Sequence, residues 1–244
     1  MLRFLAILLM IAAPCTAQQA AWDVDLELVL LADATGSIDN DEIMFQRLGY
    51  ADAITDPFVL DAIVGGIYAR IAVAYVEWGD EFSQDVVVDW MIIDGPDSAA
   101  AFAERLMAPP RRAFGRNAIG AALLKGRDMI HSNAHQGLRN VIDLSADTAN
   151  NWNGPGIAEA RAVVLADGIV INGLAVLCRY CSGQPISYDL EAAFADGIIG
   201  GPGSFVVTAD SRETFAGSVR RKLILEIAGS GQGIRIPRPS YVRN

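Results

Sequence analysis

Several oxygen-bearing side chains stand at spacings that suit the binding of a metal ion. Asp33, Thr35 and Ser37 occupy alternate positions directly after an apolar run. Asn117 opens a stretch of small residues, and Asp147 follows a second apolar run. Carboxylate, hydroxyl and amide oxygens are the ligands that hard cations such as Mg²⁺, Mn²⁺ and Ca²⁺ prefer. These five residues are candidate metal ligands, provided that the fold brings them together.

Each of the three stretches also has a structural interpretation without a metal. Residues 33–37 are compatible with a strand-to-helix turn in which Ser37 or Asp39 caps the following helix. Asp147 alone is typical of a turn, and residues 115–120 alone are typical of a loop that begins a helix. Their occurrence at matching points of one repeating pattern favours a metal site over three unrelated turns.

The elements that must position these residues follow from the hydrophobic pattern. Apolar runs alternate with helical periodicity, which is typical of a mostly parallel sheet with helices on both faces. Strands are expected at 26–32, 71–78, 85–93, 140–145, 169–177 and 204–207. Helices are expected from 39 to about 55 and at 98–107, 117–130, 157–166 and 213–228. The stretch between 177 and 204 is expected to be a looped region.

Two local signals refine this fold. Asp39 and Glu42 have the spacing of a capping box, which places the start of the first helix. A short polar turn separates strands 71–78 and 85–93, so this pair is expected to be antiparallel. The predicted fold is a doubly wound α/β sheet with one antiparallel edge strand. Ligands of such sheets gather at the carboxyl ends of the strands, and the candidate ligands all belong to that edge.

The candidate ligands resemble the metal-ion-dependent adhesion site of von Willebrand factor type A domains. The first motif of that family is D-x-S-x-S, which Asp33-x-Thr35-x-Ser37 matches with one hydroxyl exchanged for another. The second motif usually supplies a Thr where this chain has Asn117, and the third is an Asp after an apolar strand, which Asp147 matches. The resemblance implies a Rossmann-like α/β fold and a binding or adhesion role.

Further segments are similar to a group of uncharacterised exported bacterial proteins of the same type. These segments are 75–78, 141–145, and 199–203 together with 220–223. The resemblance covers essentially the whole chain after a predicted leader. It implies a fold rather than a particular biochemical role.

The resemblance also assigns a role to each candidate ligand. Thr35 and Ser37 would contact the metal through their hydroxyls, while Asp33 and Asp147 would act mainly through bound water. Asn117 offers a side-chain carbonyl, but its amide also donates hydrogen bonds and its reach differs from that of a Thr hydroxyl. A cation held in this way stays electron-poor, so an Asp or Glu of a protein partner can fill its open position.

Enzyme motifs are absent from the sequence, and no catalytic residue is predicted. There is no G-x-S-x-G elbow and no G-x-x-x-x-G-K-[S/T] phosphate loop. The glycine-rich stretch 229–233 follows a helix rather than a strand, so it lacks the setting of a dinucleotide loop. Two alternatives to a binding module stay open. One is a metal-assisted hydrolase in which Asp33 or Asp147 activates water, and the other is a scaffold of the same fold that binds no metal.

Two cysteines and two histidines lie outside the candidate site. Cys178 and Cys181 are the pair that would remain after removal of a leader, and a disulfide between them is expected in an oxidising compartment. His131 and His135 have a spacing compatible with a zinc site, but the predicted topology places the two pairs at opposite ends of the domain. Both histidines are therefore expected to be exposed.

A buried carboxylate is expected at Asp143, which lies inside an apolar strand. Asp143, Ser145 and Asp147 share one side of that strand because side chains alternate between its faces. An unpaired charge is costly in such a place. A structural hydrogen bond to backbone is the expected partner of Asp143.

The first residues have the layout of a secretory signal peptide. Arg3 gives a positive start, residues 4–13 are apolar, and small residues precede the expected cleavage after Ala17 or, alternatively, after Ala21. Acylation of Cys15, as in a lipoprotein, is a further alternative. A periplasmic or secreted location follows from this leader.

The expected organisation is a signal peptide at 1–17, one von Willebrand A-like domain at 22–229 and a flexible tail at 230–244. No later run is long and apolar enough to cross a membrane. The chain carries 19 Lys and Arg against 29 Asp and Glu, a formal net charge of −10. Such a surface repels nucleic acid and anionic lipid. The partner that the family resemblance implies is a protein that presents Asp or Glu to the metal.

Overall fold

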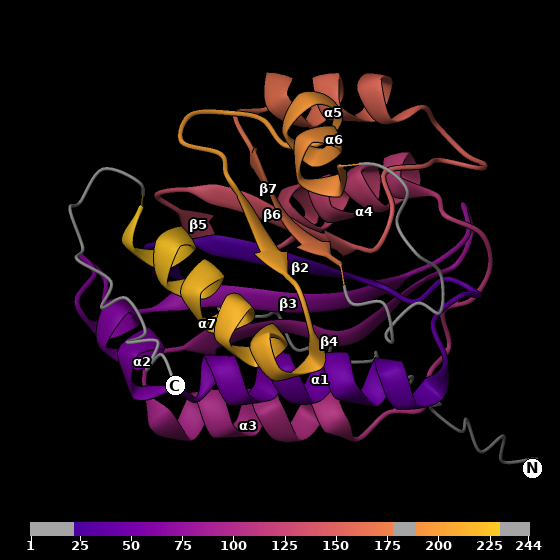
Figure 1. The fold of residues 1–244 in the computed structure, drawn as a ribbon. Coiled ribbons are helices and arrows are strands. Elements are labelled where there is room, and N and C mark those ends of the chain that lie inside the picture. Colours follow the sequence, from indigo (N-terminus) through magenta and orange to yellow (C-terminus); the bar gives the residue numbers. More distant parts are fainter. Residues whose placement is uncertain (1–21, 178–188, 230–244) are drawn as a thin grey trace, which may run out of the picture.

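Figure 1 shows the computed structural model of the protein, which describes residues 22–177 and 189–229. The predicted signal peptide at 1–17, the predicted tail at 230–244, and both Cys178 and Cys181 lie outside the described residues. The disulfide and the leader therefore stay predictions.

A six-stranded sheet forms the centre of the fold (Figure 1). Its strands, in spatial order, are β4 (Gln84–Ile93), β3 (Ile71–Trp78), β2 (Glu27–Asp33), β6 (Asn140–Ala146), β7 (Val170–Val176) and β8 (Val206–Ala209). All neighbouring pairs are parallel except β3 and β4, which are antiparallel. The predicted sheet with one antiparallel edge strand is confirmed. A small parallel pair of β1 (Asp23–Val24) and β5 (Gln136–Gly137) is absent from the prediction.

Helices cover both faces of the sheet, as Figure 1 shows. One layer contains α1 (Asn40–Ile54), α2 (Pro57–Val64), α3 (Pro96–Met107) and α7 (Arg212–Ala228). The opposite layer contains α4 (Ile119–Ser132), α5 (Ile157–Ala166) and α6 (Leu190–Gly197). Within the described ranges, none of these helices has the length and apolar character needed to cross a membrane.

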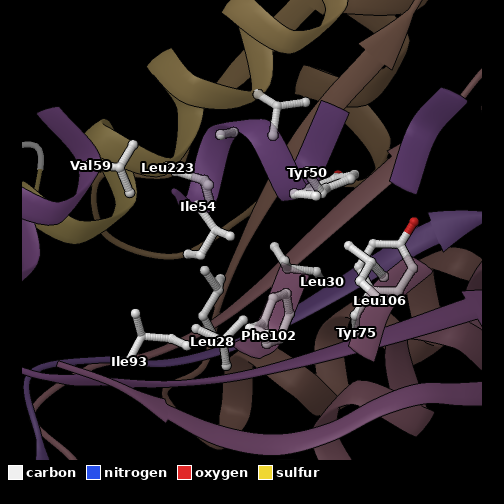
Figure 2. Packing of buried hydrophobic residues seen from close by; sticks show 14 of the residues in the cluster. Leu28, Leu30, Tyr50, Ile54, Val59, Tyr75, Ile93, Phe102, Leu106 and Leu223 are labelled. Carbon is white, nitrogen blue, oxygen red and sulfur yellow. The ribbon is translucent and has the colours of Figure 1, made fainter. Parts of the chain in front are cut away.

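The alternation of side chains along the strands divides the core into two apolar layers. Leu28 and Leu30 of β2 belong to the layer beneath α1 and α7, whereas Val29 and Leu31 belong to the layer beneath α4. Figure 2 shows the first layer, in which helical side chains such as Ile54 pack with those of the strands. Because both faces of β2 are buried, its sequence is a continuous apolar run rather than an alternating one.

The start of α1 agrees with the sequence prediction. The backbone N–H of Glu42 donates to Asp39 Oδ1 at 2.8 Å, and the backbone N–H of Asp39 donates to Glu42 Oε2 at 3.0 Å. This capping box satisfies two backbone N–H groups at the start of the helix. It also fixes the point at which the chain leaves residues 33–37 and enters α1.

Two helices are absent from the prediction. Both α2 and α6 have eight residues, which is too short for a clear helical periodicity in the sequence. Local caps begin them: Asp56 accepts from the N–H of Phe58 at 2.9 Å, and Asp189 accepts from the N–H of Ala192 at 3.0 Å. The expectation of a looped region up to residue 204 is therefore wrong where α6 lies.

Candidate metal centre

Strands β2 and β6 end side by side at the carboxyl edge of the sheet. Ala32 of β2 is in register with Ser145 of β6. Asp33 closes β2, and Asp147 follows the last residue of β6, so the two carboxylates belong to neighbouring strand ends. The sheet topology thus brings together residues that are more than a hundred positions apart in the sequence.

The turn after β2 places two hydroxyls beside a buried carboxylate. The backbone N–H of Thr35 donates to Asp33 Oδ1 at 2.8 Å, and the hydroxyl oxygens of Thr35 and Ser37 lie 3.2 Å apart. Asp33 and Thr35 are buried, whereas Ser37 is exposed. One turn therefore carries three of the candidate ligands and opens to solvent at Ser37.

The carboxyl group of Asp33 is costly to ionise where it stands. Burial, and next the neighbouring charge of Asp147, raise the pKa of Asp33 from 3.8 to about 7, while hydrogen bonds from Thr35 and from the backbone of Asp147 oppose this shift. Its Oδ2 atom is buried without a hydrogen-bond partner among the described residues. A cavity of about 10 Å³ is lined by Asp33, Ser145 and Asp147 among others, which is close to the room that one water molecule needs. A cation would compensate the charge of this carboxylate pair.

The donor set fits a hard divalent cation. Carboxylate and hydroxyl oxygens suit such an ion, and the unpartnered Oδ2 of Asp33 offers it a lone pair. In the part of the chain that the structure describes, no group of three or more His, Cys, Asp or Glu side chains could hold a metal ion. The candidate centre therefore depends on hydroxyl and amide oxygens in addition to its two carboxylates.

The loop that carries Asn117 is held against the turn after β2. The backbone N–H of Gly36 donates to the carbonyl of Gly115 at 2.7 Å. The carbonyl of Asn117 accepts from the backbone N–H of Trp152 at 2.7 Å, which joins this loop to the one after β6. The three sequence stretches thus meet at one place, and the backbone of Asn117 takes part in that contact.

Arg111 positions the turn after β2, and it is not among the residues that the sequence pattern indicates. Its guanidinium donates to the carbonyls of Ala34 at 2.6 Å, Thr35 at 2.9 Å and Ile38 at 2.6 Å. It therefore fixes the backbone that presents the hydroxyls. The available signal is an arginine pair directly after Pro110 in an acidic chain, but sequence spacing alone does not show what these arginines contact.

A buried ion pair supports the loop that contains Arg111. The Nε atom of Arg47 in α1 donates to Oε1 of Glu77 in β3 at 2.7 Å, and both side chains are buried. Arg47 also donates to the carbonyl of Pro109 at 2.5 Å. The start of the loop is therefore tied to both the sheet and α1.

Two expectations about polar residues away from the centre are wrong. Asp143 forms an ion pair with the buried Lys222 of α7 instead of a bond to backbone, and Lys222 also binds Glu226 at 2.7 Å. The ammonium group of Lys222 is thus shared by two carboxylates, and burial raises the pKa of Glu226 to about 7. His135 is buried rather than exposed and lies edge-on to Trp90, with ring centroids 6.1 Å apart. These partners come from distant parts of the sequence, so local patterns do not predict them.

The sheet topology, with helices on both faces, is that of a von Willebrand factor type A-like domain. The chain is similar to proximal thread matrix protein 1 from the mussel byssus, with a TM-score of 0.59 and 16% identity over 84% of this chain and 48% of that chain. It is similar to the pilus adhesin SpaC from Lactobacillus rhamnosus GG, with a TM-score of 0.59 and 15% identity over 86% of this chain and 31% of that chain. It is also similar to a von Willebrand factor type A protein from Catenulispora acidiphila, with a TM-score of 0.53 and 16% identity over 84% of this chain and 43% of that chain.

The chain belongs to the family described as protein of unknown function DUF1194, which matches residues 23–231. No curated protein sequence matches the chain. The chain spans about half, or less, of the length of these three solved structures. A further structure of the mussel protein has a zinc-occupied MIDAS motif and is similar to this chain with a TM-score of 0.58 at 15% identity, over 84% of this chain and 48% of that chain.

Proposed function

We propose that the protein is an exported, metal-dependent binding or adhesion module that engages an acidic group of a protein partner. A divalent cation, Mg²⁺ or else Mn²⁺ or Ca²⁺, would be held by Asp33, Thr35, Ser37, Asn117 and Asp147. The observation that carries the proposal is the buried Asp33 carboxylate, which lies beside a second carboxylate and has an oxygen without a partner among the described residues. When bound, the cation supplies a Lewis-acidic position that a partner carboxylate can fill.

Electrostatics at the strand ends support this role. The charge of the half-buried Asp147 repels the buried carboxylate of Asp33 and contributes to the raised pKa of Asp33. The nearby guanidinium of Arg111 donates hydrogen bonds to the backbone carbonyls of the turn. A small divalent cation would compensate the charge and leave the positioning role of Arg111 unchanged.

The similarities support a binding role for the same edge of the sheet. The MIDAS motif of the mussel protein holds zinc in one structure, and SpaC is a pilus adhesin. By analogy, this chain would bind a protein at the carboxyl edge of its sheet. Export to the periplasm or beyond, with a signal peptide at 1–17, a binding domain at 22–229 and a tail at 230–244, belongs to the same proposal.

Isothermal titration of Mg²⁺ and Mn²⁺ into the metal-free protein tests the proposal. The unmodified protein should bind one ion per chain, and Asp33→Ala should give no heat of binding while keeping its circular dichroism spectrum. Asp128→Ala is the matched control, because the Asp128 side chain lies on α4 and is 68% exposed. Equal heats from the Asp33→Ala and control variants would rule out this centre.

A further inference from the structure

Exposed aromatic side chains stand on loops around the candidate metal centre. Phe82 is 91% exposed, Phe114 is 53% exposed and Trp152 is 61% exposed. They belong to the β3–β4 turn, the loop before α4 and the loop after β6, and we refer to the three as the aromatic rim. Single exposed apolar residues are common on protein surfaces, but a group on adjoining loops is typical of an interaction site.

Hydrogen bonds join the loops of the aromatic rim to one another and to the candidate centre. The backbone N–H of Asp80 donates to the carbonyl of Phe114 at 3.0 Å, and the N–H of Phe114 donates to Ser83 Oγ at 3.0 Å. Trp152 donates its backbone N–H to the carbonyl of Asn117, one of the candidate ligands. The aromatic rim is therefore continuous with the metal centre.

The loop that carries Trp152 has a fixed shape. Asn151 Oδ1 accepts from the backbone N–H of Gly120 at 3.1 Å, and its amide donates to the carbonyls of Asn153 at 2.9 Å and Pro155 at 3.1 Å. A Cβ atom at Gly120 would lie 2.0 Å from the Pro155 carbonyl oxygen, so this close approach requires glycine. Binding to a loop that is already ordered costs less conformational entropy.

Arginines accompany the aromatic side chains. The guanidinium of Arg111 lies 4.5 Å from the ring centroid of Phe114, and that of Arg116 lies 4.6 Å from the centroid of Trp152. Acidic side chains stand among them, because Nη1 of Arg112 lies 3.9 Å from Oδ1 of Asp85, and Asp80 and Glu81 precede Phe82 in the β3–β4 turn. Arg116 is exposed above the ring of Trp152. Its guanidinium favours a partner carboxylate at that point of the aromatic rim.

We propose that the aromatic rim, together with Arg116, recognises an acidic protein segment in which apolar side chains flank the Asp or Glu that reaches the metal. This inference rests on the proposed function, because the cation supplies the position for that carboxylate. Aromatic faces bury flanking apolar side chains, and guanidinium groups bind additional carboxylates. An uncharged carbohydrate would also stack on the aromatic rings, but it would offer no carboxylate to the guanidinium of Arg116.

Titrations of the ¹⁵N-labelled full chain with synthetic peptides, followed by NMR in saturating Mg²⁺, test the inference. One capped pentapeptide has a central Glu flanked by Phe on each side, a second has the Glu flanked by Gly, and a third has Gln between the two Phe residues. The Phe-flanked Glu peptide should bind about tenfold more tightly than the Gly-flanked one, as expected for well-packed aromatic contacts. Its largest amide shifts should fall at Phe114, Asn117 and Trp152, and the Gln peptide should bind most weakly.

Substitutions test whether the aromatic rim causes the difference in affinity between the Phe-flanked and the Gly-flanked peptide. Phe114→Ser and Trp152→Ser should each remove much of the advantage of the Phe-flanked peptide, and Arg116→Gln should weaken both Glu peptides. Phe58→Ser is the matched control, because Phe58 is 64% exposed and lies in α2, beyond the far end of α1. The 15 residues of α1 separate it from the metal centre by about 22 Å.

The outcomes separate this inference from the proposed function. Equal affinities for the Phe-flanked and Gly-flanked peptides, both dependent on Mg²⁺, would overturn the inference and leave the metal function standing. Binding of the Phe-flanked peptide that persists in chelator and is lost in Trp152→Ser would support the aromatic rim and overturn the role of the metal. Shifts at Trp152 caused by mannose or galactose oligosaccharides but by none of the peptides would overturn the inference in favour of a carbohydrate partner.

Discussion

Replacing Asp33 by Asn changes how the stability of the metal-free protein depends on pH. The Asn side chain keeps an oxygen that can accept the hydrogen bond from the Thr35 N–H, but it has no charge. In the unmodified protein the pKa of Asp33 is raised from 3.8 to about 7, first by burial and then by the charge of Asp147. The folded state therefore holds this proton at pH values at which the unfolded chain has released it.

The sign of the effect follows from proton binding. Because the folded state binds the proton more tightly, its contribution to stability is complete below the unfolded pKa and is lost as the pH rises through about 7. Between pH 5.5 and pH 8 the loss amounts to about 2 kcal/mol for a group with these two pKa values. Asp33→Asn should therefore gain about 2 kcal/mol relative to the unmodified protein over this interval.

Urea unfolding in chelator at pH 5.5 and pH 8 measures this difference. Glu226, whose pKa is also raised to about 7, adds a pH dependence of its own, but it is common to both proteins and cancels in the comparison. Saturating Mg²⁺ should reverse the trend of the unmodified protein, since the metal requires the ionised carboxylate. A stability difference between the two proteins that is the same at both pH values would refute this account of Asp33.

Three further substitutions follow from the contacts around the centre and beneath α7. Asn117→Thr should tighten Mg²⁺ binding by roughly fivefold in calorimetry if a hydroxyl ligates better than the amide, and weaker binding would contradict that reasoning. Arg111→Met should lower the free energy of unfolding by about 2–3 kcal/mol and weaken Mg²⁺ binding, because three backbone carbonyls of the turn lose their hydrogen-bond donor. An unchanged Mg²⁺ affinity would show that Arg111 does not position the ligands. Lys222→Met should lower the free energy of unfolding by about 3–5 kcal/mol at pH 8, because Asp143 and Glu226 lose the ammonium group that they share. The loss should be smaller at pH 5, where both carboxylates can be protonated. Urea unfolding measures both values, and an equal loss at the two pH values would argue against charge as the cause.

Local sequence signals predicted the parts of the fold whose physics is local. Strand β2 is buried on both faces and appears as a continuous apolar run, and the capping box of α1 lies within four residues. The turn from Asp33 to Ser37 is equally local, because its hydrogen bonds span two residues. Short elements carried too little pattern: α6 was expected as a loop, and β8 was placed two residues too early.

The sequence pattern does not predict which side chains from distant parts of the chain contact one another. Asp143 was recognised as a buried charge, but its partner Lys222 lies on the last described helix. His135 is expected to be exposed, whereas α4 ends at Ser132 and the chain turns inward, so that His135 lies against Trp90. Arg111 acts on backbone carbonyls that are more than 70 residues away. Such partners are set by tertiary packing, which spacing along one chain does not encode.

Calorimetric titration of Mg²⁺ into the metal-free protein decides whether the strand ends bind a metal. The unmodified protein should bind one ion per chain, Asp33→Ala should give no heat, and a hundredfold excess of Mg²⁺ over Kd should add about 2.7 kcal/mol to the unfolding free energy of the unmodified protein. A folded protein that gives no heat with Mg²⁺ or Mn²⁺, and whose melting curves coincide in chelator and in millimolar Mg²⁺, would contradict metal binding at the strand ends. The carboxylates of Asp33 and Asp147 would then belong to a scaffold that binds no metal.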